Sequence, residues 1–315
     1  MIADLLERFK AWEAIEDDPD LESGSLPLVL YLTKKLYGDY EPGGMQPFML
    51  RLRRWLDNVD TESDQKILIS LLSHVFYAGR GEFESLYRTT LTNIYRWLVQ
   101  VSGADLAATN LSAILDVELA STWICPVTDS LRINSFLKIN GISGHDHRPH
   151  WRSLAQFGDT SKINEYLHEN SISRLILLED FVGSGTQIEK TVDFACTNFG
   201  SLDIGLCPLI VCPDGDRRLA AMAGKHSRLS YLPTMVLPEE VLLGPVAKAK
   251  EPPTFTKGRD LISRVRGRLR TEPFGFKQTG ALVVLFSNCP DNTLAIFRDE
   301  AARWDPLFPR VWRPE

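Results

Sequence analysis

The chain has 315 residues, a formal net charge of −6, and hydrophobic and charged fractions of 44% and 24%. These values are typical of a soluble globular protein with one large domain or two ordinary ones, and the negative charge argues against a general attraction to nucleic acid. No apolar run reaches the length of a membrane span, and the N-terminal residues lack the organisation of a secretory signal.

Cysteine usage also indicates a cytoplasmic protein. The five cysteines are odd in number and form no Cys-x-x-Cys pair. This pattern favours reduced, buried thiols in a reducing compartment over disulfides. We therefore expect cytoplasmic localisation and free thiols at Cys125, Cys196, Cys207, Cys212 and Cys289.

Helical periodicity runs through the first 118 residues. Apolar residues share one face from Ile2 to Trp12, and glycine- and proline-containing breaks separate the later apolar stretches. The sequence therefore predicts an all-helical N-terminal region, residues 1–118, followed by an α/β domain, residues 119–315. Further helices of this region are expected over residues 26–37, 46–58, 63–78, 82–101 and 104–117.

The pattern changes after residue 120. Ser121 to Val127 is predicted to form a strand, and the polar residues Thr128, Asp129 and Ser130 follow it. Taken alone, these three residues also fit an ordinary turn in which side chains bond to the backbone.

The octet of residues 145–152 is unusual because it holds three of the six histidines. The spacing of His145, His147 and His150 resembles the ligand run of the metallo-β-lactamase fold, although Pro149 stands where that run carries an aspartate. A zinc site is therefore one interpretation of the octet. A solvated loop without chemistry is another.

The most informative stretch covers residues 173–187. Leu175 to Leu178 form a short apolar run that suits a strand buried on both faces, and a helix predicted over residues 160–170 forms the crossover to it. The acids Glu179 and Asp180 follow at the carboxyl end of this strand, where open α/β sheets bind their ligands. The sequence thus predicts an acid pair at the ligand-binding edge of a parallel sheet.

A glycine-rich loop and a helix follow the acid pair. In residues 183–186 two glycines let the backbone turn sharply and direct several N–H groups to one point, and a helical pattern starts at Ile188. Such a loop at a helix N-terminus binds phosphate, and carboxylates accept hydrogen bonds from a vicinal diol. Together they predict a site for a ribose 5-phosphate. We expect Gly185 to lie so close to the phosphate that a side chain there would occupy the anion's space.

Residues 175–187 resemble the phosphoribosyl-pyrophosphate (PRPP) motif of type I phosphoribosyltransferases: four apolar residues, two acids, two apolar residues, and a loop of small and hydroxyl residues. The match is in register except that Gln187 replaces the last hydroxyl residue. The resemblance implies a mostly parallel, doubly wound sheet, with Glu179 and Asp180 holding the ribose. It implies a phosphate site formed by Val182, Gly183, Ser184, Gly185, Thr186 and Gln187.

The same resemblance implies roles for two earlier segments. A short loop after an earlier strand binds pyrophosphate in that family, which implies this role for Thr128, Asp129 and Ser130. A mobile basic loop closes over PRPP, which adds a third interpretation of the octet. Mg²⁺, with Asp180 as a protein ligand, would offset the pyrophosphate charge. The catalytic residues implied in this way are Glu179, Asp180, Arg148, His150 and Arg152.

Two strands and a basic helix are predicted after the motif. The strands cover residues 202–211 and 227–237, and the helix covers residues 257–270. Arginines occupy the polar face of this helix, which fits either a solvated basic face or a contact with nucleic acid, a nucleoprotein or a partner protein. These arginines are Arg259, Arg264, Arg266, Arg268 and Arg270.

The C-terminal segment is aromatic and rich in proline. We expect a strand over residues 281–286, its continuation over residues 294–297, and an ending that packs on the core because it is too apolar for a free tail. Its Gly-Phe-Lys opening, Val-Val-Leu-Phe strand and Trp-x-Pro-Leu-Phe-Pro-Arg close resemble the phosphoribosyltransferase-like family linked to bacterial conflict systems. Those proteins accompany retron reverse transcriptases, ABC-three-component and related anti-phage modules. The resemblance therefore implies an effector of anti-phage defence.

Three hypotheses for function follow. The leading one is glycosyl transfer from PRPP or a ribose 5-phosphate nucleotide, a reaction in which positive charge develops at the anomeric carbon and no protein nucleophile is needed. The alternative is a non-catalytic nucleotide sensor that signals to a partner protein of a defence operon, because the same pocket serves either role. A scaffold that contacts a partner through the helical region and the arginine-rich face is the third.

Overall fold

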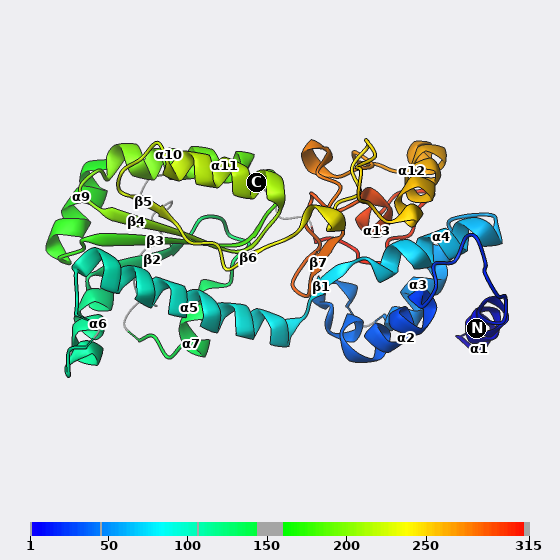
Figure 1. The fold of residues 1–315 in the computed structure, drawn as a ribbon, viewed down its shortest axis with the longest axis horizontal. Helices are drawn as coiled ribbons and strands as arrows, with labels where there is room; N and C mark the ends of the chain where they lie inside the picture. The colour runs from blue at the N-terminus through cyan, green and yellow to red at the C-terminus, as the bar shows by residue number, and fades with distance from the viewer. Residues whose placement is uncertain (1, 45, 106, 144–159, 312–315) are drawn as a thin grey trace. The chain divides into compact units, whose positions relative to one another are not determined.

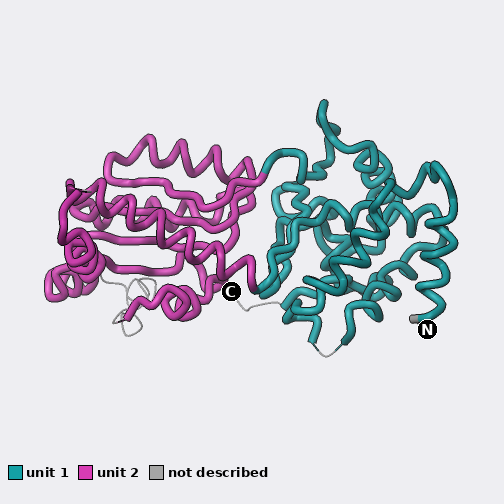
Figure 2. The backbone as a smooth tube through the Cα atoms, turned by 60° about the horizontal axis from the view of Figure 1, so that its bottom comes forward, with its two compact units in different colours: residues 1–80, 238–315 teal, residues 81–237 magenta. Residues whose placement is uncertain are grey.

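The computed structural model describes residues 2–44, 46–105, 107–143 and 160–311. The chain forms two compact units: unit 1 comprises residues 1–80 and 238–315, and unit 2 comprises residues 81–237 (Figure 2). Unit 2 is one continuous segment, whereas unit 1 is assembled from both ends of the chain. The compact units thus divide at 80/81 and 237/238, and a domain boundary at 118/119 stays a prediction.

Unit 2 is built on a five-stranded sheet in the order β2-β3-β4-β5, in which β6 also pairs with β4. Every pairing is parallel. The central strands β3 and β4 are buried along nearly their whole length, which is typical of a parallel sheet covered by helices. The predicted α/β fold with a parallel sheet is confirmed. The strands are β2 (Thr122–Pro126), β3 (Arg174–Val182), β4 (Asp203–Val211), β5 (Leu229–Tyr231) and β6 (Met235–Val236).

Helices cover both faces of this sheet: α10 and α11 lie on one face and α5 on the other (Figure 1). Val192 and Ala195 of α10 and Leu219 of α11 are buried in the same apolar core as the strands. The α11 helix begins at Pro213, whose fixed φ and missing N–H suit a first helical turn. The helices are α5 (Arg80–Ser102), α6 (Leu111–Ala120), α7 (Ile133–Ile139), α9 (Thr160–Glu169), α10 (Thr186–Asn198) and α11 (Pro213–Ala223).

Unit 1 is mainly helical and contains a small parallel sheet of β1 (Phe76–Ala78) and β7 (Val283–Leu285). The Thr61 side chain caps α4 by accepting a hydrogen bond from the Asp64 backbone N–H at 3.1 Å, and Glu62 and Asp64 lie in the first turn, where acids are favoured. The helices are α1 (Ile2–Glu13), α2 (Ser25–Lys35), α3 (Phe48–Leu56), α4 (Glu62–Ser73), α12 (Pro253–Val265) and α13 (Ala295–Arg298). Single 3₁₀ turns cover Tyr37–Asp39, Glu41–Gly43, Glu239–Val241, Arg266–Arg268 and Phe276–Gln278.

The aromatic ending of the chain packs into unit 1, as predicted. Phe308 is fully buried, and its ring centroid lies 5.6 Å from that of Tyr37 and 5.8 Å from that of Phe48. Trp304 is also buried and donates its indole N–H to the Ile296 carbonyl at 2.9 Å. Burial of these rings joins the two ends of the chain in one core.

Several predicted elements differ from the structure. The helix predicted over residues 257–270 is α12, which begins at Pro253 and ends at Val265. The helix expected over residues 63–78 ends at Ser73, because Phe76 donates its N–H to the Leu282 carbonyl and its neighbours pair with β7. The strand expected over residues 227–237 is divided into β5 and β6 at Pro233, which has no N–H. Residues 295–298 form α13 rather than a strand. A short, fully buried apolar run does not distinguish the two by its periodicity.

Candidate functional site

The acid pair and the turn after β2 lie together at one edge of the unit 2 sheet. The Thr128 backbone N–H donates to Glu179 Oε2 at 3.0 Å, and Thr128 Oγ1 donates to Glu179 Oε1 at 2.7 Å. Ser130 Oγ lies 2.8 Å from Asp180 Oδ1 and 3.2 Å from Glu179 Oε1. Thr128 and Ser130 of the turn therefore form one cluster with the acid pair, whereas the side chain of Asp129 between them is exposed.

Strand register explains why these segments meet. The last residue of β2, Pro126, pairs with Leu178, and the Val127 N–H donates to the Leu178 carbonyl at 2.7 Å. β3 continues past this point, since its pairing with β4 extends to Val182 opposite Val211. The residues after β2 therefore turn directly beside Glu179 and Asp180.

Burial and charge dominate the electrostatics of the pair. Glu179 and Asp180 are 4% and 6% exposed. Burial, reinforced by the neighbouring charge of Asp180, raises the pKa of Glu179 from 4.5 to about 8, while hydrogen bonds from Thr128 and Ser130 oppose this shift. Folding therefore favours the protonated form of Glu179.

The predicted phosphate loop connects β3 to α10. β3 ends at Val182, α10 begins at Thr186, and Gly185 between them has φ +74°, in the left-handed region that favours glycine. Ser184 Oγ and Thr186 Oγ1 lie 3.2 Å apart at the start of the helix. The first N–H groups of a helix have no partner within it, so this loop can bind an anion through its backbone.

One expectation about this loop is wrong: the side-chain position of Gly185 does not point into open space for an anion. A Cβ there would lie 3.1 Å from Arg218 Cδ and 3.4 Å from Gly215 Cα. Gly185 therefore faces α11, and its positive φ is the reason that a glycine is favoured there.

Packing of α11 against the loop was not predicted. A Cβ on Gly215 would lie 2.6 Å from the Gly183 carbonyl oxygen and 2.8 Å from Val182 Cγ1, so the helix contacts the loop backbone directly. Arg218 Nε donates to the Ser184 carbonyl at 3.0 Å, and its Nη1 donates to Glu189 Oε2 at 2.7 Å. The sequence holds no signal for these contacts, because they depend on where α11 lies on the sheet.

A tyrosine of α5 also lies near the acid pair. Tyr87 is 5% exposed, and its ring centroid lies 5.6 Å from that of Phe136 in α7. Burial raises the pKa of the Tyr87 hydroxyl, and the negative charge of Asp180 raises it further. In the sequence, Tyr87 is one of several aromatic residues at helical spacing, and nothing there marks it as a site residue.

The octet, and with it Arg148, His150 and Arg152, lies outside the described residues. The zinc, solvated-loop and basic-loop interpretations of it stay predictions. Within the described ranges, no group of three or more His, Cys, Asp or Glu side chains could hold a metal ion. The acid pair still fits Mg²⁺, since this ion is commonly bound by one or two carboxylates together with substrate phosphates.

Several arginines of the predicted basic helix have partners inside unit 1. Arg259 pairs with Glu251 and Arg264 with Asp64. Arg268 Nη2 lies 3.1 Å from Asp60 Oδ2. The Arg270 backbone N–H donates to Asp299 Oδ2, and Arg266 is exposed. These ion pairs reduce the positive charge that the helix offers to a nucleic acid.

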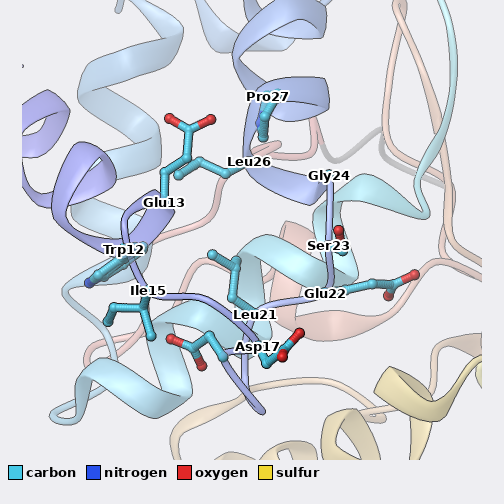
Figure 3. A pocket seen from close by; sticks show the side chains of 11 residues that line it. Trp12, Glu13, Ile15, Asp17, Leu21, Glu22, Ser23, Gly24, Leu26 and Pro27 are labelled. Atoms are coloured by element: carbon cyan, nitrogen blue, oxygen red, sulfur yellow. The ribbon is translucent and has the colours of Figure 1, made fainter.

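Unit 1 contains a pocket of about 470 Å³ around the connection from α1 to α2 (Figure 3). Carboxylates and apolar side chains line it together. Asp18 in its lining pairs with Lys66 at 2.8 Å and Glu22 with His74 at 2.7 Å, so part of its charge is compensated. Its lining residues are Trp12, Glu13, Ile15, Asp17, Asp18, Leu21, Glu22, Ser23, Gly24, Leu26 and Pro27.

Two further features agree with the sequence analysis. All five cysteines are free thiols, and four of them are buried. No helix in the described part of the chain is long and apolar enough to cross a membrane.

Comparison with known proteins finds one family. The family model described as PRTase-CE matches residues 52–310. Neither the curated proteins nor the solved structures give a match.

Proposed function

Since the chain belongs to the PRTase-CE family, a phosphoribosyltransferase-like family, we propose that it binds PRPP or a ribose 5-phosphate nucleotide at the edge of the unit 2 sheet. The 5-phosphate binds to the loop of residues 182–187 through backbone N–H groups. The ribose hydroxyls bind Glu179 and Asp180, and a pyrophosphate group binds the turn of residues 128–130.

One observation carries this proposal: the turn is hydrogen-bonded to the acids, and the acids continue directly into the loop. Ser130 Oγ lies 2.8 Å from Asp180 Oδ1, and Thr128 Oγ1 lies 2.7 Å from Glu179 Oε1. Phosphate, diol and pyrophosphate subsites in this order match the layout of PRPP.

Glycosyl transfer at the anomeric carbon is the reaction that this arrangement would serve. Positive charge develops on the sugar as pyrophosphate leaves, and the carboxylate of Asp180 beside the ribose would stabilise it. Asp180 would also hold Mg²⁺, which offsets the charge of the pyrophosphate when it is bound. Arg148, His150 and Arg152 would neutralise the leaving group from the octet.

Non-catalytic nucleotide sensing is a second candidate, and the upward shift of the Glu179 pKa favours it. A neutral carboxyl group holds a ribose hydroxyl but gives little stabilisation to a developing cation. The raised pKa of Glu179 therefore supports ligand binding more directly than it supports catalysis.

We also propose that the protein acts in the cytoplasm as an effector of bacterial anti-phage defence, together with partner proteins of its operon. The resemblance of its C-terminal segment to conflict-system proteins supports this role. Its free cysteines fit a reducing compartment.

Calorimetric titration with PRPP and Mg²⁺ tests the proposal, with release of pyrophosphate as the assay for turnover. Wild-type protein should bind, and Asp180→Asn should bind more weakly by about 1.5–3 kcal/mol, because an ionic hydrogen-bond acceptor is lost. Asp116→Asn, an exposed residue of α6, is the matched control and should bind normally.

Each outcome has a distinct meaning. Binding with turnover selects the transferase, and binding without turnover selects the sensor. Unchanged affinity in Asp180→Asn, with circular dichroism showing an intact fold, would remove the diol-binding role of the acid pair.

A further inference from the structure

The hydroxyls of Thr128 and Ser130 form a continuous chain of contacts between the two acids. Glu179 Oε1 lies 2.7 Å from Thr128 Oγ1, Thr128 Oγ1 lies 2.7 Å from Ser130 Oγ, and Ser130 Oγ lies 2.8 Å from Asp180 Oδ1. All three separations are those of good O–H···O hydrogen bonds. Four oxygens from two segments about 50 residues apart therefore form one row of short contacts, and the 3.2 Å separation between Ser130 Oγ and Glu179 Oε1 adds a fourth, longer contact.

Protons can be counted along this row. Two hydroxyls supply two protons for these three short contacts and the 3.2 Å contact, so at least one short contact lacks a proton when both acids are ionised. Protonation of Glu179 supplies the missing proton and reverses the first hydrogen bond. Thr128 donates to an ionised Glu179, whereas a protonated Glu179 donates to Thr128, Thr128 donates to Ser130, and Ser130 donates to Asp180. Burial of Glu179 favours this protonated form.

The two hydroxyls also have the geometry of a ligand's diol. Oxygens on adjacent gauche carbons of a sugar lie about as far apart as two hydrogen-bonded hydroxyls, about 2.8 Å. Thr128 Oγ1 and Ser130 Oγ lie 2.7 Å apart, so they offer Glu179 and Asp180 two hydroxyls with the spacing of a cis-diol. These two hydroxyls belong to the protein and not to a ligand.

We propose that Thr128 and Ser130 occupy the diol positions of the acid pair in the free protein, and that a ligand with a cis-diol binds by replacing them. This inference rests on the proposed function. It adds that the hydroxyls of Thr128 and Ser130 compete with the ligand's diol for the two acids. Ser130 is then a residue that sets affinity and specificity by holding Asp180. Release of the turn also makes its hydroxyls available to a pyrophosphate group.

The competition predicts that removing a hydroxyl strengthens binding. Ser130→Ala removes one of the two internal hydroxyls and leaves the acids intact. Calorimetry with ribose 5-phosphate should show affinity raised roughly 2- to 10-fold, the range given by the net value of one hydrogen bond. With 2-deoxyribose 5-phosphate, which lacks the cis-diol, the gain should be smaller. Ser227→Ala, an exposed serine of the same unit, should leave both affinities unchanged.

The direction in which Ser130→Ala changes the affinity for ribose 5-phosphate separates this inference from the proposed function. If Ser130 contacts the ligand directly, Ser130→Ala weakens binding. Weaker or unchanged binding of ribose 5-phosphate would overturn the inference and leave the proposed function standing. Absence of binding by both wild-type protein and Ser130→Ala would overturn the proposed function and the inference with it.

Hydrogen exchange on the wild-type protein gives a second readout that needs no variant. The Thr128 N–H donates to Glu179 Oε2 at 3.0 Å. Ribose 5-phosphate, which carries no pyrophosphate to retain the turn, should therefore increase exchange of amides in residues 127–131. Slower or unchanged exchange in this segment on saturation with ribose 5-phosphate would overturn the replacement of the turn.

Discussion

Gly215→Ala is the sharpest test of how the loop is held. A methyl group at this position would lie 2.6 Å from the Gly183 carbonyl oxygen and 2.8 Å from Val182 Cγ1. Both separations are below van der Waals contact, so either the loop or α11 must move. Ribose 5-phosphate binding should weaken because the loop backbone that receives the phosphate shifts.

The expected loss of stability is the sum of two opposing terms. Overpacking in a tight interior site costs about 1–3 kcal/mol. Replacing glycine by alanine in a helix recovers about 0.4–1 kcal/mol, mainly by restricting the unfolded chain. The free energy of unfolding should therefore fall by about 1–2 kcal/mol, the difference of these terms.

Gly224 supplies a matched control at the end of the same helix. Its φ is −65°, and a Cβ there would meet nothing closer than 3.5 Å. Gly224→Ala should therefore raise the free energy of unfolding by up to about 1 kcal/mol and leave the affinity for ribose 5-phosphate unchanged. Urea denaturation followed by circular dichroism gives both free energies, and equal m values would show that the unfolded states are comparable. If Gly215→Ala is as stable as Gly224→Ala and binds ribose 5-phosphate normally, the close contact between α11 and the loop does not exist.

The remaining predictions concern the acid and the loop glycine. Because the pKa of Glu179 is raised from 4.5 to about 8 on folding, the native state holds the proton more tightly, and stability from this group falls as pH rises through that window. Glu179→Gln resembles the protonated acid, so the free energy of unfolding should no longer fall over this pH range. The exposed Glu165→Gln should still show the fall. If the pH dependence of stability is unchanged in Glu179→Gln, the raised pKa of Glu179 is contradicted. Gly185→Val forces a β-branched residue to a φ of +74°, at a cost of about 1–2 kcal/mol, and should weaken ribose 5-phosphate binding by disordering the loop. Ser184→Ala should weaken binding by only about 0.5–1.5 kcal/mol, so equal calorimetric affinities would argue against a backbone cradle.

The sequence determined the elements whose signal is local. Four apolar residues from Leu175, two acids and a glycine pair specify a buried strand, a turn and a helix start within about a dozen positions, and the structure places β3 and α10 there. The sequence did not tell which glycine of the pair is left-handed: Gly185 adopts this conformation and Gly183 does not. The sequence also predicted that the aromatic C-terminal segment is buried, because it is too apolar for a free tail.

Only the tertiary structure decided which of these elements touch. Phe76 belongs to β1 rather than to a longer α4 because its partner, Val283, is brought beside it from the other end of the chain. Gly215 and Arg218 reach the loop because α11 lies on the sheet next to α10. No local periodicity encodes such contacts.

The chemistry of the acid pair has the same origin. The sequence places Glu179 and Asp180 at a strand end, but it does not tell whose pKa is raised or which groups bond to it. Register decides this: β2 stops at Pro126 while β3 continues to Val182, so the residues after β2 turn onto the acids and bury them. Burial depends on what surrounds a carboxyl group in space, and therefore the pKa of Glu179 is a property of the fold and not of its neighbours in the chain.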